Sequence, residues 1–556
     1  MRGRIVAGLV LVAIVAVVAA GPFGLLGASS SSSLSSPSPT PSVAAQPSGS
    51  TQAASGTPGA AGSPVASGGA SPSSVATATS GPLADVPVVP VTQFRATQTS
   101  TTLDEVAAVL LGTSDRYVGL ELVKGEADAI LASFRLERPT DAALLVLAPD
   151  SDTLARDLAA NRKRLAFLRA DEVEPDVRAL AWGGKALFGV DRVRKLADWP
   201  LTARLPAPTT AAAFDPSTTW TLFAGGDIML DRGVYETLAV KGKGADFPFQ
   251  GGTAEITGRC QNCSPLGWDT PYTRRTGNAG AVRHVVSSAD IAIANFENPA
   301  PDEPKWHKSG TVFSAAPRFI DGLAYAGIDY VSLANNHIRD AGGAGLLQTI
   351  RNVTERGIAV SGAGKNLAAA RKPAMLEAAG TKVAILGYDA IAGSYHATAS
   401  KIGSAPLTGA NLKADVAAAR RAGADVVIVF PHWGTEYDPT PFANQEKLAH
   451  LAIDAGADMV IGNHAHWAAA MEVYNGKPIW YALGNFVFDQ TWSEPTMEGI
   501  TLELTLRGSE LVQVGLRPHI ILDKAQPLPR PGRFRPHRDG PGLPGLEGPP
   551  ALVSRR

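Results

Sequence analysis

Three histidines that lie close together in the sequence could bind a metal ion. His432 follows a short apolar run, 426–430, and His464 and His466 follow a second run, 459–461. Neutral imidazole is the commonest metal ligand, and histidines at i and i+2 on a loop that leaves a strand can turn toward one point. A lone histidine in an apolar setting is most often a core residue with satisfied hydrogen bonds. Three of the chain's ten histidines at the ends of neighbouring predicted strands favour a metal site instead.

The two apolar runs are typical of strands buried on both faces of a sheet. Between them, residues 445–455 carry apolar side chains at helical spacing, and Gly456 follows where a helix would stop. This order predicts a unit of strand, helix and parallel strand. In open α/β sheets, ligands bind outside the carboxyl ends of the strands, which is where the histidines are expected.

Other predicted strands of the same region also end in polar residues. One such strand end means little, but five in one region predict a single polar site at the carboxyl edge of a sheet. The three further strand ends are 220–224 leading to Asp227, 291–294 leading to Asn295 and Glu297, and 330–333 leading to Asn335, Asn336 and His337.

The remaining pattern completes an α/β domain. Apolar runs alternate with amphipathic stretches that end at glycine, and near the end two alternating segments flank a turn, which indicates a hairpin. The predicted elements are strands 382–387 and 479–483, helices 346–356 and 412–421, and the hairpin strands 500–506 and 511–516.

The first 28 residues have the features of an export signal. Arg2 and Arg4 precede a mostly apolar stretch, 5–28, longer than the roughly 7 to 15 residues of a signal-peptide core. Such a stretch can span a bilayer, so we expect an N-terminal membrane anchor, with secretion after cleavage as the alternative. We therefore expect the folded part to lie outside the cytoplasm.

Composition divides the rest of the chain. Residues 29–82 are almost entirely Ser, Pro, Ala, Gly and Thr, so they lack the apolar side chains that offset the entropy of ordering, and a disordered linker is expected. A net charge of −1 gives no indication of a nucleic-acid partner. The other predicted segments are a small α/β domain of unknown function at 83–206, the main domain at 218–523 and a disordered Pro- and Arg-rich tail at 524–556.

Two local features of the sequence allow more than one interpretation. Cys260 and Cys263, the only cysteines, favour a local disulfide, because a zinc site needs two more ligands and a redox motif needs a thioredoxin-like context. In the small domain, Arg162–Arg164 favours the solvated face of a charged helix over a site for polyanions.

Five segments resemble the CapA family of capsule-synthesis proteins, which are associated with poly-gamma-glutamate and belong to the calcineurin-like metallophosphoesterase superfamily. The likeness covers about 220–522, in the family's motif order. It implies a four-layer sandwich, with two mixed sheets between helices, and a metal centre at the strand ends. The segments are 226–230, 334–337, 432–437, 455–458 with the histidine loop, and 483–486.

The resemblance implies roles for these residues. It implies one or two divalent ions, Mn, Fe or Zn, and a phosphoester or a cell-surface polymer as substrate. His337 would protonate the leaving group, with Asp340 as its orienting partner. The implied metal ligands are Asp227, Glu297, Asn336, His432, His464 and His466, and the implied substrate-binding residues are Asn295, Asn335, Trp433, Glu436, Tyr437 and Asn485.

Two departures from the superfamily pattern bear on the number of metal ions. Met229 occupies the place of the first motif's histidine, and a thioether suits hard divalent ions poorly. Glu297 replaces an aspartate that would bridge two metals.

Other roles stay open for several of the implied site residues. The alternatives are loop capping by Asn335 and Asn336, surface positions for Glu436 and Tyr437, and a turn role for Asn485.

The sequence thus predicts an extracytoplasmic protein of capsule or poly-gamma-glutamate biosynthesis that acts as a metal-dependent hydrolase of the phosphoester type. The alternative is a non-catalytic, membrane-tethered component of a polymer synthesis or export complex, which uses the same fold as a binding platform and contacts other capsule synthesis proteins. Met229 favours the alternative, whereas His432, His464 and His466 favour chemistry.

Overall fold

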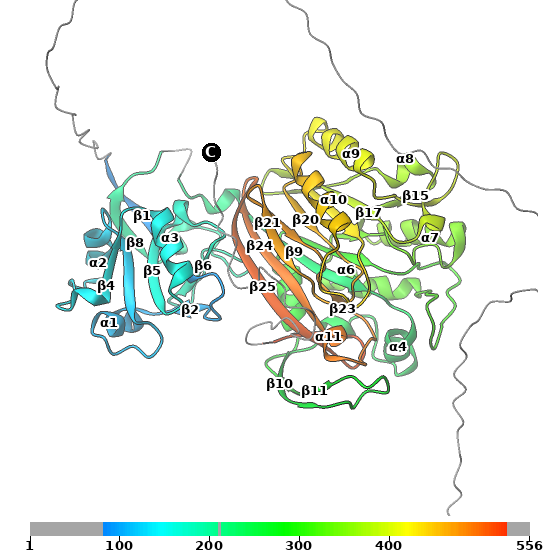
Figure 1. The fold of residues 1–556 in the computed structure, drawn as a ribbon, viewed down its shortest axis with the longest axis horizontal. Helices are drawn as coiled ribbons and strands as arrows, with labels where there is room; N and C mark the ends of the chain where they lie inside the picture. Colours follow the sequence, from blue (N-terminus) through cyan, green and yellow to red (C-terminus); the bar gives the residue numbers. More distant parts are fainter. Residues whose placement is uncertain (1–81, 210–212, 531–556) are drawn as a thin grey trace, which may run out of the picture. The chain divides into compact units, whose positions relative to one another are not determined.

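The computed structural model describes residues 82–209 and 213–530 (Figure 1). The predicted anchor, almost all of the linker and residues 531–556 lie outside the described residues. Within the described part, no helix combines the length and the apolar composition needed to cross a membrane.

The segment 83–206 forms a small α/β domain with its own core. Its sheet has the order β4-β3-β5-β1-β6, and β8 pairs with β1. Apolar side chains of both the strands and the helices, among them Val89, Leu122, Ile130 and Leu158, fill one cluster. The strands are β1 (Leu83–Gln93), β3 (Gly119–Val123), β4 (Leu145–Ala148), β5 (Arg164–Arg169), β6 (Val177–Ala179) and β8 (Thr202–Pro206), and the helices are α1 (Leu103–Leu110), α2 (Ala127–Phe134) and α3 (Ser151–Ala160).

The basic triplet Arg162–Arg164 does not lie on a helix, so that prediction is wrong. Asp150 caps α3 by accepting a hydrogen bond from the backbone of Thr153, and the helix ends at Ala160. Arg162 and Lys163 form the turn into β5, Arg164 is the first residue of that strand, and its Nη1 lies 2.8 Å from the buried carboxylate of Glu121. One of the three charges is therefore used inside the small domain.

The first sheet of the main domain has eight strands. Its order is β14-β13-β12-β9-β24-β25-β26, with β23 beside β9, and β14, β13, β12, β9 and β23 run parallel. The expected hairpin forms its antiparallel part. The strands are β9 (Thr219–Ile228), β12 (Ile291–Phe296), β13 (Tyr330–Ser332), β14 (Ala359–Ser361), β23 (Asn485–Val487), β24 (Glu498–Arg507), β25 (Glu510–Leu522) and β26 (Gln526–Pro529).

The borders of the main domain differ from those predicted. Strand β26 pairs with β25, so the sheet continues past residue 523. At the other end, Arg192, predicted within the small domain, donates from Nη2 to the backbone oxygen of Thr219 at 2.7 Å and pairs with Asp290 at 2.8 Å. Composition could not predict the pairing of β26 or the contacts of Arg192, because they form only in the folded sheet.

The second sheet is made of six strands in the order β16-β17-β19-β20-β22-β21. Strands β17, β19, β20 and β22 run parallel, as expected for the unit that carries the histidines. The strands are β16 (Ala374–Ala378), β17 (Thr381–Asp389), β19 (Val426–His432), β20 (Met459–Ile461), β21 (Met471–Tyr474) and β22 (Lys477–Trp480).

The two sheets pack face to face between two helical layers. One apolar cluster joins them, with Leu222 and Ile293 from the first sheet and Ile385 and Ile428 from the second. Side chains on the outer face of each sheet pack against helices, so the main domain is a four-layer sandwich. The helices are α5 (Ala281–Ser288), α6 (Ile320–Ala326) and α7 (Gly342–Thr354) over the first sheet, and α9 (Gly409–Arg421) and α10 (Ala443–Asp454) over the second.

Short elements surround the sandwich, among them a hairpin of β10 (Thr253–Cys260) and β11 (Thr270–Thr276). A disulfide joins Cys260 and Cys263 at its turn, as the sequence predicts. The remaining short elements are β2 (Ser100–Thr101), β7 (Ala181–Trp182), β15 (Ala363–Gly364), β18 (Gly403–Ser404), α4 (Arg232–Tyr235), α8 (Leu367–Ala370) and α11 (Glu494–Met497).

Candidate metal centre

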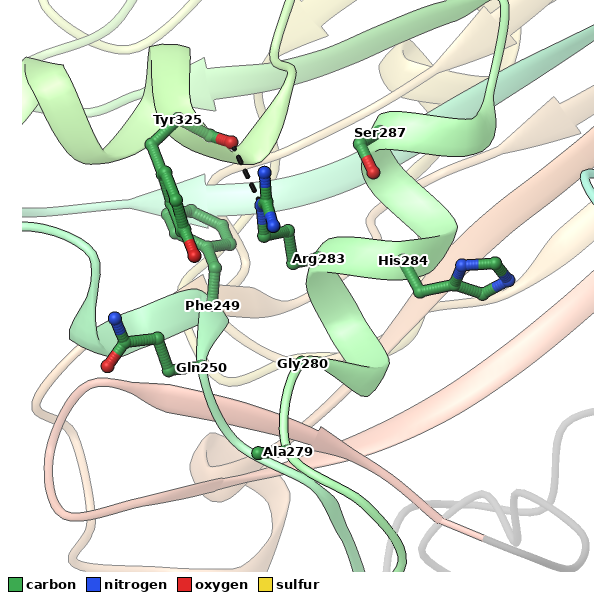
Figure 2. A pocket seen from close by; sticks show the side chains of 8 residues that line it. All are labelled: Phe249, Gln250, Ala279, Gly280, Arg283, His284, Ser287 and Tyr325. Atoms are coloured by element: carbon green, nitrogen blue, oxygen red, sulfur yellow. Dashed lines mark hydrogen bonds between the residues drawn. The ribbon is translucent and has the colours of Figure 1, made fainter.

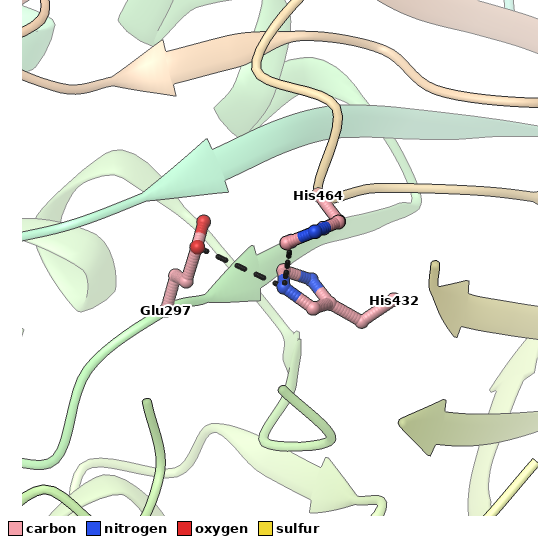
Figure 3. Close-up of side chains that lie close together, drawn as sticks. All are labelled: Glu297, His432 and His464. Carbon is pink, nitrogen blue, oxygen red and sulfur yellow. Dashed lines mark hydrogen bonds and ion pairs between the residues drawn. The ribbon is translucent and has the colours of Figure 1, made fainter. Parts of the chain in front are cut away.

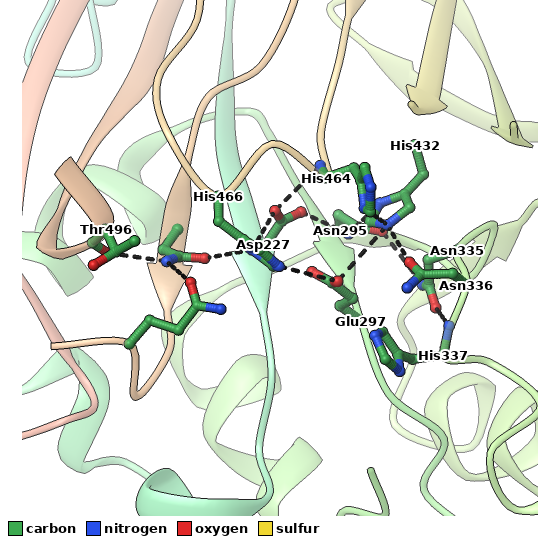
Figure 4. Close-up of polar contacts among 12 residues, drawn as sticks. Asp227, Asn295, Glu297, Asn335, Asn336, His337, His432, His464, His466 and Thr496 are labelled. Atoms are coloured by element: carbon green, nitrogen blue, oxygen red, sulfur yellow. Dashed lines mark hydrogen bonds and ion pairs between the residues drawn. The ribbon is translucent and has the colours of Figure 1, made fainter. Parts of the chain in front are cut away.

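Five predicted ligands meet at the carboxyl ends of four strands (Figure 4). The first sheet carries two of them and the second sheet carries the three histidines, so the packed sheets place both sets at one edge. Every one of the five side chains is at most 4% exposed. They are Asp227 in β9, Glu297 after β12, His432 at the end of β19, and His464 and His466 after β20.

The first group of potential ligands comprises Glu297, His432 and His464, whose ligand atoms all lie within 4.8 Å of one another (Figure 3). Nε2 of His432 lies 3.7 Å from Oε1 of Glu297 and 3.0 Å from Nδ1 of His464. Oδ1 of Asn336, also a predicted ligand, lies 2.7 Å from the same nitrogen. One proton cannot serve three acceptors equally well, whereas a cation would suit all four atoms.

The second group comprises Asp227, Glu297 and His466, again within 4.8 Å of one another. Nδ1 of His466 lies 3.4 Å from Oδ2 of Asp227, and Nε2 of His466 lies 3.7 Å from Oε1 of Glu297. Glu297 therefore belongs to both groups. Its carboxylate is placed either to bind one ion or to lie between two.

The Glu297 carboxylate fits a cation site on electrostatic grounds. Both of its oxygens are buried and neither has a hydrogen-bond partner in the described part of the chain. Burial raises the pKa of Glu297 well above its ordinary value, and the negative charge of Asp227 raises it further. A buried charge without a partner is costly, and a divalent ion would offset that cost.

Two of the three histidines, His432 and His464, are held neutral, which is the form that binds metals. Burial lowers the pKa of His432 well below its usual value, and the neighbouring His464 and His466 lower it further. Burial also lowers the pKa of His464 to about 3. The backbone φ angles of His464 and His466 are +93° and +54°, in the left-handed region that L-residues adopt at a cost.

Two predicted substrate-binding residues form hydrogen bonds with predicted metal ligands. Nδ2 of Asn295 donates to Oδ1 of Asp227 at 2.7 Å and lies 3.2 Å from Nδ1 of His432. Oδ1 of Asn485 accepts from Nδ1 of His466 at 2.9 Å, which leaves Nε2 of that ring for Glu297 or an ion. Such partners orient ligands and fix the tautomer of a histidine. Asn295 and Asn485 are both buried, and substrate contact by either of them stays a prediction.

His337 lies beside this cluster with a separate set of partners. Its Nδ1 lies 2.9 Å from Oδ2 of Asp340, as predicted. The same carboxylate accepts from the backbone of Phe313 at 2.8 Å and from the hydroxyl of Tyr395 at 3.0 Å. Because Asp340 engages Nδ1, the other nitrogen of His337 is the one available for proton transfer. Asn335 accepts from the backbone of His337 at 3.1 Å, so it caps the loop.

Trp433 is not a substrate-binding residue, and that prediction is wrong. Its side chain is 2% exposed and packs in the core on the helix side of the second sheet. Its Nε1 donates to the backbone oxygen of Tyr481 at 2.9 Å. Side chains alternate along a strand, so with His432 at the site the next residue points to the opposite face.

Glu436 and Tyr437 lie at the edge of the site. Glu436 is exposed, and its charge helps to raise the pKa of Glu297. The ring of Tyr437 lies 5.9 Å from that of His466, and its hydroxyl accepts from Nε2 of Gln490 at 3.0 Å. Both residues lie near the ligand cluster, and their role as wall residues stays a prediction.

Met229 contributes nothing to the ligand cluster. It is fully buried in the core of the first sheet, and its sulfur accepts from the backbone of Asp231 at 3.0 Å. The place of the first-motif histidine is thus filled by an apolar side chain, and Asp227 is left as the ligand from that motif.

Three polar residues near the site were not singled out from the sequence. Asn463 is 1% exposed, and within the described part both atoms of its side-chain amide have no hydrogen-bond partner. Its place between Gly462 and His464 was the signal available. Tyr395 lies far from the motifs in sequence, so its contact with Asp340 could not be foreseen. Arg232 lies two residues after the first motif, 226–230.

A separate pocket lies by α5, away from the predicted ligands (Figure 2). Arg283, His284 and Tyr325 are among its lining residues, and Nε of Arg283 donates to the backbone oxygen of Tyr325 at 3.2 Å. None of the predicted site residues lines it. The chemistry-bearing cluster is therefore not in this pocket.

Comparison with known proteins gives the family. Residues 221–490 match the family model described as bacterial capsule synthesis protein PGA_cap. A probable polyglutamine synthesis accessory protein of Mycobacterium tuberculosis (strain CDC 1551 / Oshkosh) is 30% identical over 290 residues, which cover 48% of this chain and 74% of that protein. The chain belongs to the PGA_cap family. The family predicted from the sequence motifs is thus confirmed.

Other matches to this PGA_cap chain extend the comparison. Capsule biosynthesis protein CapA of Bacillus anthracis is 34% identical over 244 residues, which cover 42% of this chain and 59% of the relative. The chain thus spans less than two thirds of that relative. Among solved structures, the calcineurin-like phosphoesterase YfkN from Bacillus subtilis is similar, with a TM-score of 0.30 and 12% identity over 54% of this chain and 90% of that chain. The mixed α/β fold predicted for the family is present here.

Proposed function

We propose that this PGA_cap protein is a metal-dependent hydrolase of phosphoester bonds that acts in the synthesis of a cell-surface polymer, poly-gamma-glutamate being the candidate. The observation that carries the proposal is the pair of ligand groups that share the unpartnered carboxylate of Glu297. Three buried histidines beside two buried carboxylates form a donor set that suits Mn, Fe or Zn.

Each part of the site has a role in this reaction. When bound, a divalent ion supplies polarisation of a phosphoryl oxygen and activation of water. Asp227, Glu297, His432, His464, His466 and Asn336 would hold it, and Asn295 and Asn485 keep their partners in orientation. His337 gives a proton to the leaving oxygen, and the Asp340 carboxylate holds its ring in place through Nδ1.

The site of action that fits this chemistry is outside the cytoplasm, at the membrane. The Cys260–Cys263 disulfide supports an oxidising compartment, and the apolar stretch 5–28 supports an anchor. A growing polymer and other capsule synthesis proteins would then be within reach of the folded part.

One observation favours a second function, that of a non-catalytic platform in a polymer synthesis complex. Met229 replaces a histidine ligand and its sulfur is engaged by the backbone of Asp231. A site with fewer ligands could bind a polymer or a partner without turning it over.

Elemental analysis of the purified protein separates the two functions, with a His464→Ala/His466→Ala variant as the control. Near-stoichiometric Mn, Fe or Zn in the wild type and background levels in the folded variant, together with hydrolysis of aryl phosphoesters, would support the hydrolase. If the wild type takes up no metal even from excess ions, the platform is the correct function.

A further inference from the structure

Arg232 lies between His337 and the cluster of predicted metal ligands. Its guanidinium carbon lies 4.8 Å from the ring centre of Phe313 and 5.6 Å from that of Phe488. The Phe313 ring is 4.1 Å from the ring of His337, and the Phe488 ring is 4.8 Å from the ring of His466. Arg232 is thus adjacent, through one ring on each side, to the proton donor and to a ligand.

The arginine is held in place but is not saturated. Its Nη2 donates to Oδ1 of Asp489 at 2.6 Å, and its Nη1 donates to the backbone oxygen of Gly310 at 3.0 Å. Its Nε is buried and has no hydrogen-bond partner within the described part of the chain. A guanidinium has five N–H groups, so donors remain for another acceptor. The side chain is 14% exposed, so a ligand can reach it.

The charge of Arg232 acts on the ligand cluster. Burial, Asp227 and Glu436 raise the pKa of Glu297, whereas the positive charge of Arg232 lowers it. The carboxylates of Asp227 and Glu297 together would about neutralise one divalent ion. An anionic substrate would therefore arrive without a remaining positive partner, unless a fixed cation is nearby.

We propose that Arg232 is the oxyanion-binding residue of this site and holds the phosphoryl group of the substrate next to the ligand cluster. This assignment rests on the proposed function. Arginine suits the task because its planar fork can donate two parallel hydrogen bonds to one phosphate or carboxylate. The carboxylate of a glutamyl chain offers the same acceptor geometry, so the test must separate these two sources.

The test measures equilibrium binding of inorganic phosphate, and separately of a γ-linked glutamate trimer, to the metal-loaded protein by titration calorimetry. Arg232→Gln is expected to weaken phosphate binding by about tenfold or more, and Arg232→Lys by less, because it keeps the charge and loses the fork. Arg371→Gln is the matched control. That arginine is also partly buried and pairs with an aspartate, Asp415, at 2.7 Å, but it lies in the helical layer.

The outcomes separate this proposal from the proposed function. Equal phosphate affinity in wild type and Arg232→Gln, at equal metal content, would overturn the role of Arg232 and leave the hydrolase standing. A second outcome is that the wild type binds metal and the glutamate trimer but not phosphate, and that Arg232→Gln weakens binding of the trimer. This result would support the oxyanion site and overturn phosphoester hydrolysis. If circular dichroism shows that Arg232→Gln does not fold, the phosphate affinity of Arg232→Lys is compared with that of the wild type in its place.

Discussion

The carboxylates of Glu297 and Asp340 lie in the same candidate site, but among the described residues only that of Asp340 has hydrogen-bond partners. Three groups donate to Asp340: His337, the backbone of Phe313 and the hydroxyl of Tyr395. Both oxygens of Glu297 are buried without a partner in the described structure. We call the residues around Glu297 the ligand half and those around Asp340 the His337 half. The first is incomplete without a cation, and the second is complete as it stands.

This difference has an energetic meaning. A polar network whose members are all satisfied contributes to the stability of the fold, whereas a buried, unpartnered carboxylate lowers it. The ligand half therefore lowers the stability of the metal-free protein and would recover it on binding. The His337 half should behave the same with and without metal.

Glu297→Gln should have the largest effect and the most informative one. Metal content is expected to fall to background, because both ligand groups lose their shared member. At the same time the metal-free variant should be more stable than the metal-free wild type, by roughly 1 to 3 kcal/mol at pH 7, since no charge has to be buried. Elemental analysis and urea unfolding measure the two effects. A loss of stability in the metal-free variant would contradict the description of the ligand half.

The same residue predicts a pH dependence. The pKa of Glu297 is raised above its ordinary 4.5 in the folded protein, so the folded state keeps its proton where the unfolded state has lost it. The contribution of Glu297 to the free energy of unfolding is therefore full below about pH 4.5. It is lost as the pH rises through the pKa that Glu297 has in the folded protein. Unfolding of the metal-free protein between pH 4 and 8 should show this decline, and Glu297→Gln should lack this part of it.

His337→Gln tests the other half. The turnover number for an aryl phosphoester is expected to fall by about 10²- to 10⁴-fold, the usual contribution of a general acid. Metal content should not change, because His337 contacts Asp340 and Phe313 and belongs to neither ligand group. A variant that loses metal as well would show that the two halves are not separate.

Asn485→Ala should weaken metal affinity by about 10- to 100-fold, because His466 would lose the partner that orients it. Asn335→Ala is the matched control. That asparagine caps the loop of His337, donates to the backbone oxygen of Phe296 at 2.8 Å and reaches Asn295 only at 3.5 Å. Its loss should therefore lower stability and change metal affinity much less than the loss of Asn485. Equal metal affinities in the two variants would argue against the orienting role of Asn485.

Trp433→Phe should have the smallest effect on the site. The variant removes the hydrogen bond to the backbone oxygen of Tyr481, which should cost about 1 to 2 kcal/mol of unfolding free energy. Metal content and turnover should stay within twofold of the wild type. A loss of substrate affinity without a loss of stability would show that Trp433 is a substrate-binding residue after all.

Strand ends were the part of the site that the sequence could predict. Asp227, Glu297 and His432 each follow a run of buried apolar residues, and runs of that kind form parallel strands whose ends share an edge. The error at Trp433 has the same origin, since the motif gives the strand end but not the face on which each residue lies. The side of a strand is decided by packing, here against Tyr481.

Contacts across long sequence separations could not be predicted. Tyr395 reaches Asp340 from a loop 55 residues away, and Arg232 reaches Asp489 across 257 residues. The sequence spacing of these two pairs does not indicate that their residues are in contact. The helix expected around Arg162 fails for a local reason, because an asparagine follows α3 and the next residues already turn into a strand.

The left-handed backbone at His464 and His466 has a consequence for how this chain can change over generations. Glycine would relieve the backbone strain at either position, so the metal-free protein would be more stable with glycine there. A lineage released from the need for an ion would therefore be expected to drift toward glycine or asparagine there. This chain has an imidazole at both places, a choice that backbone strain alone would not favour.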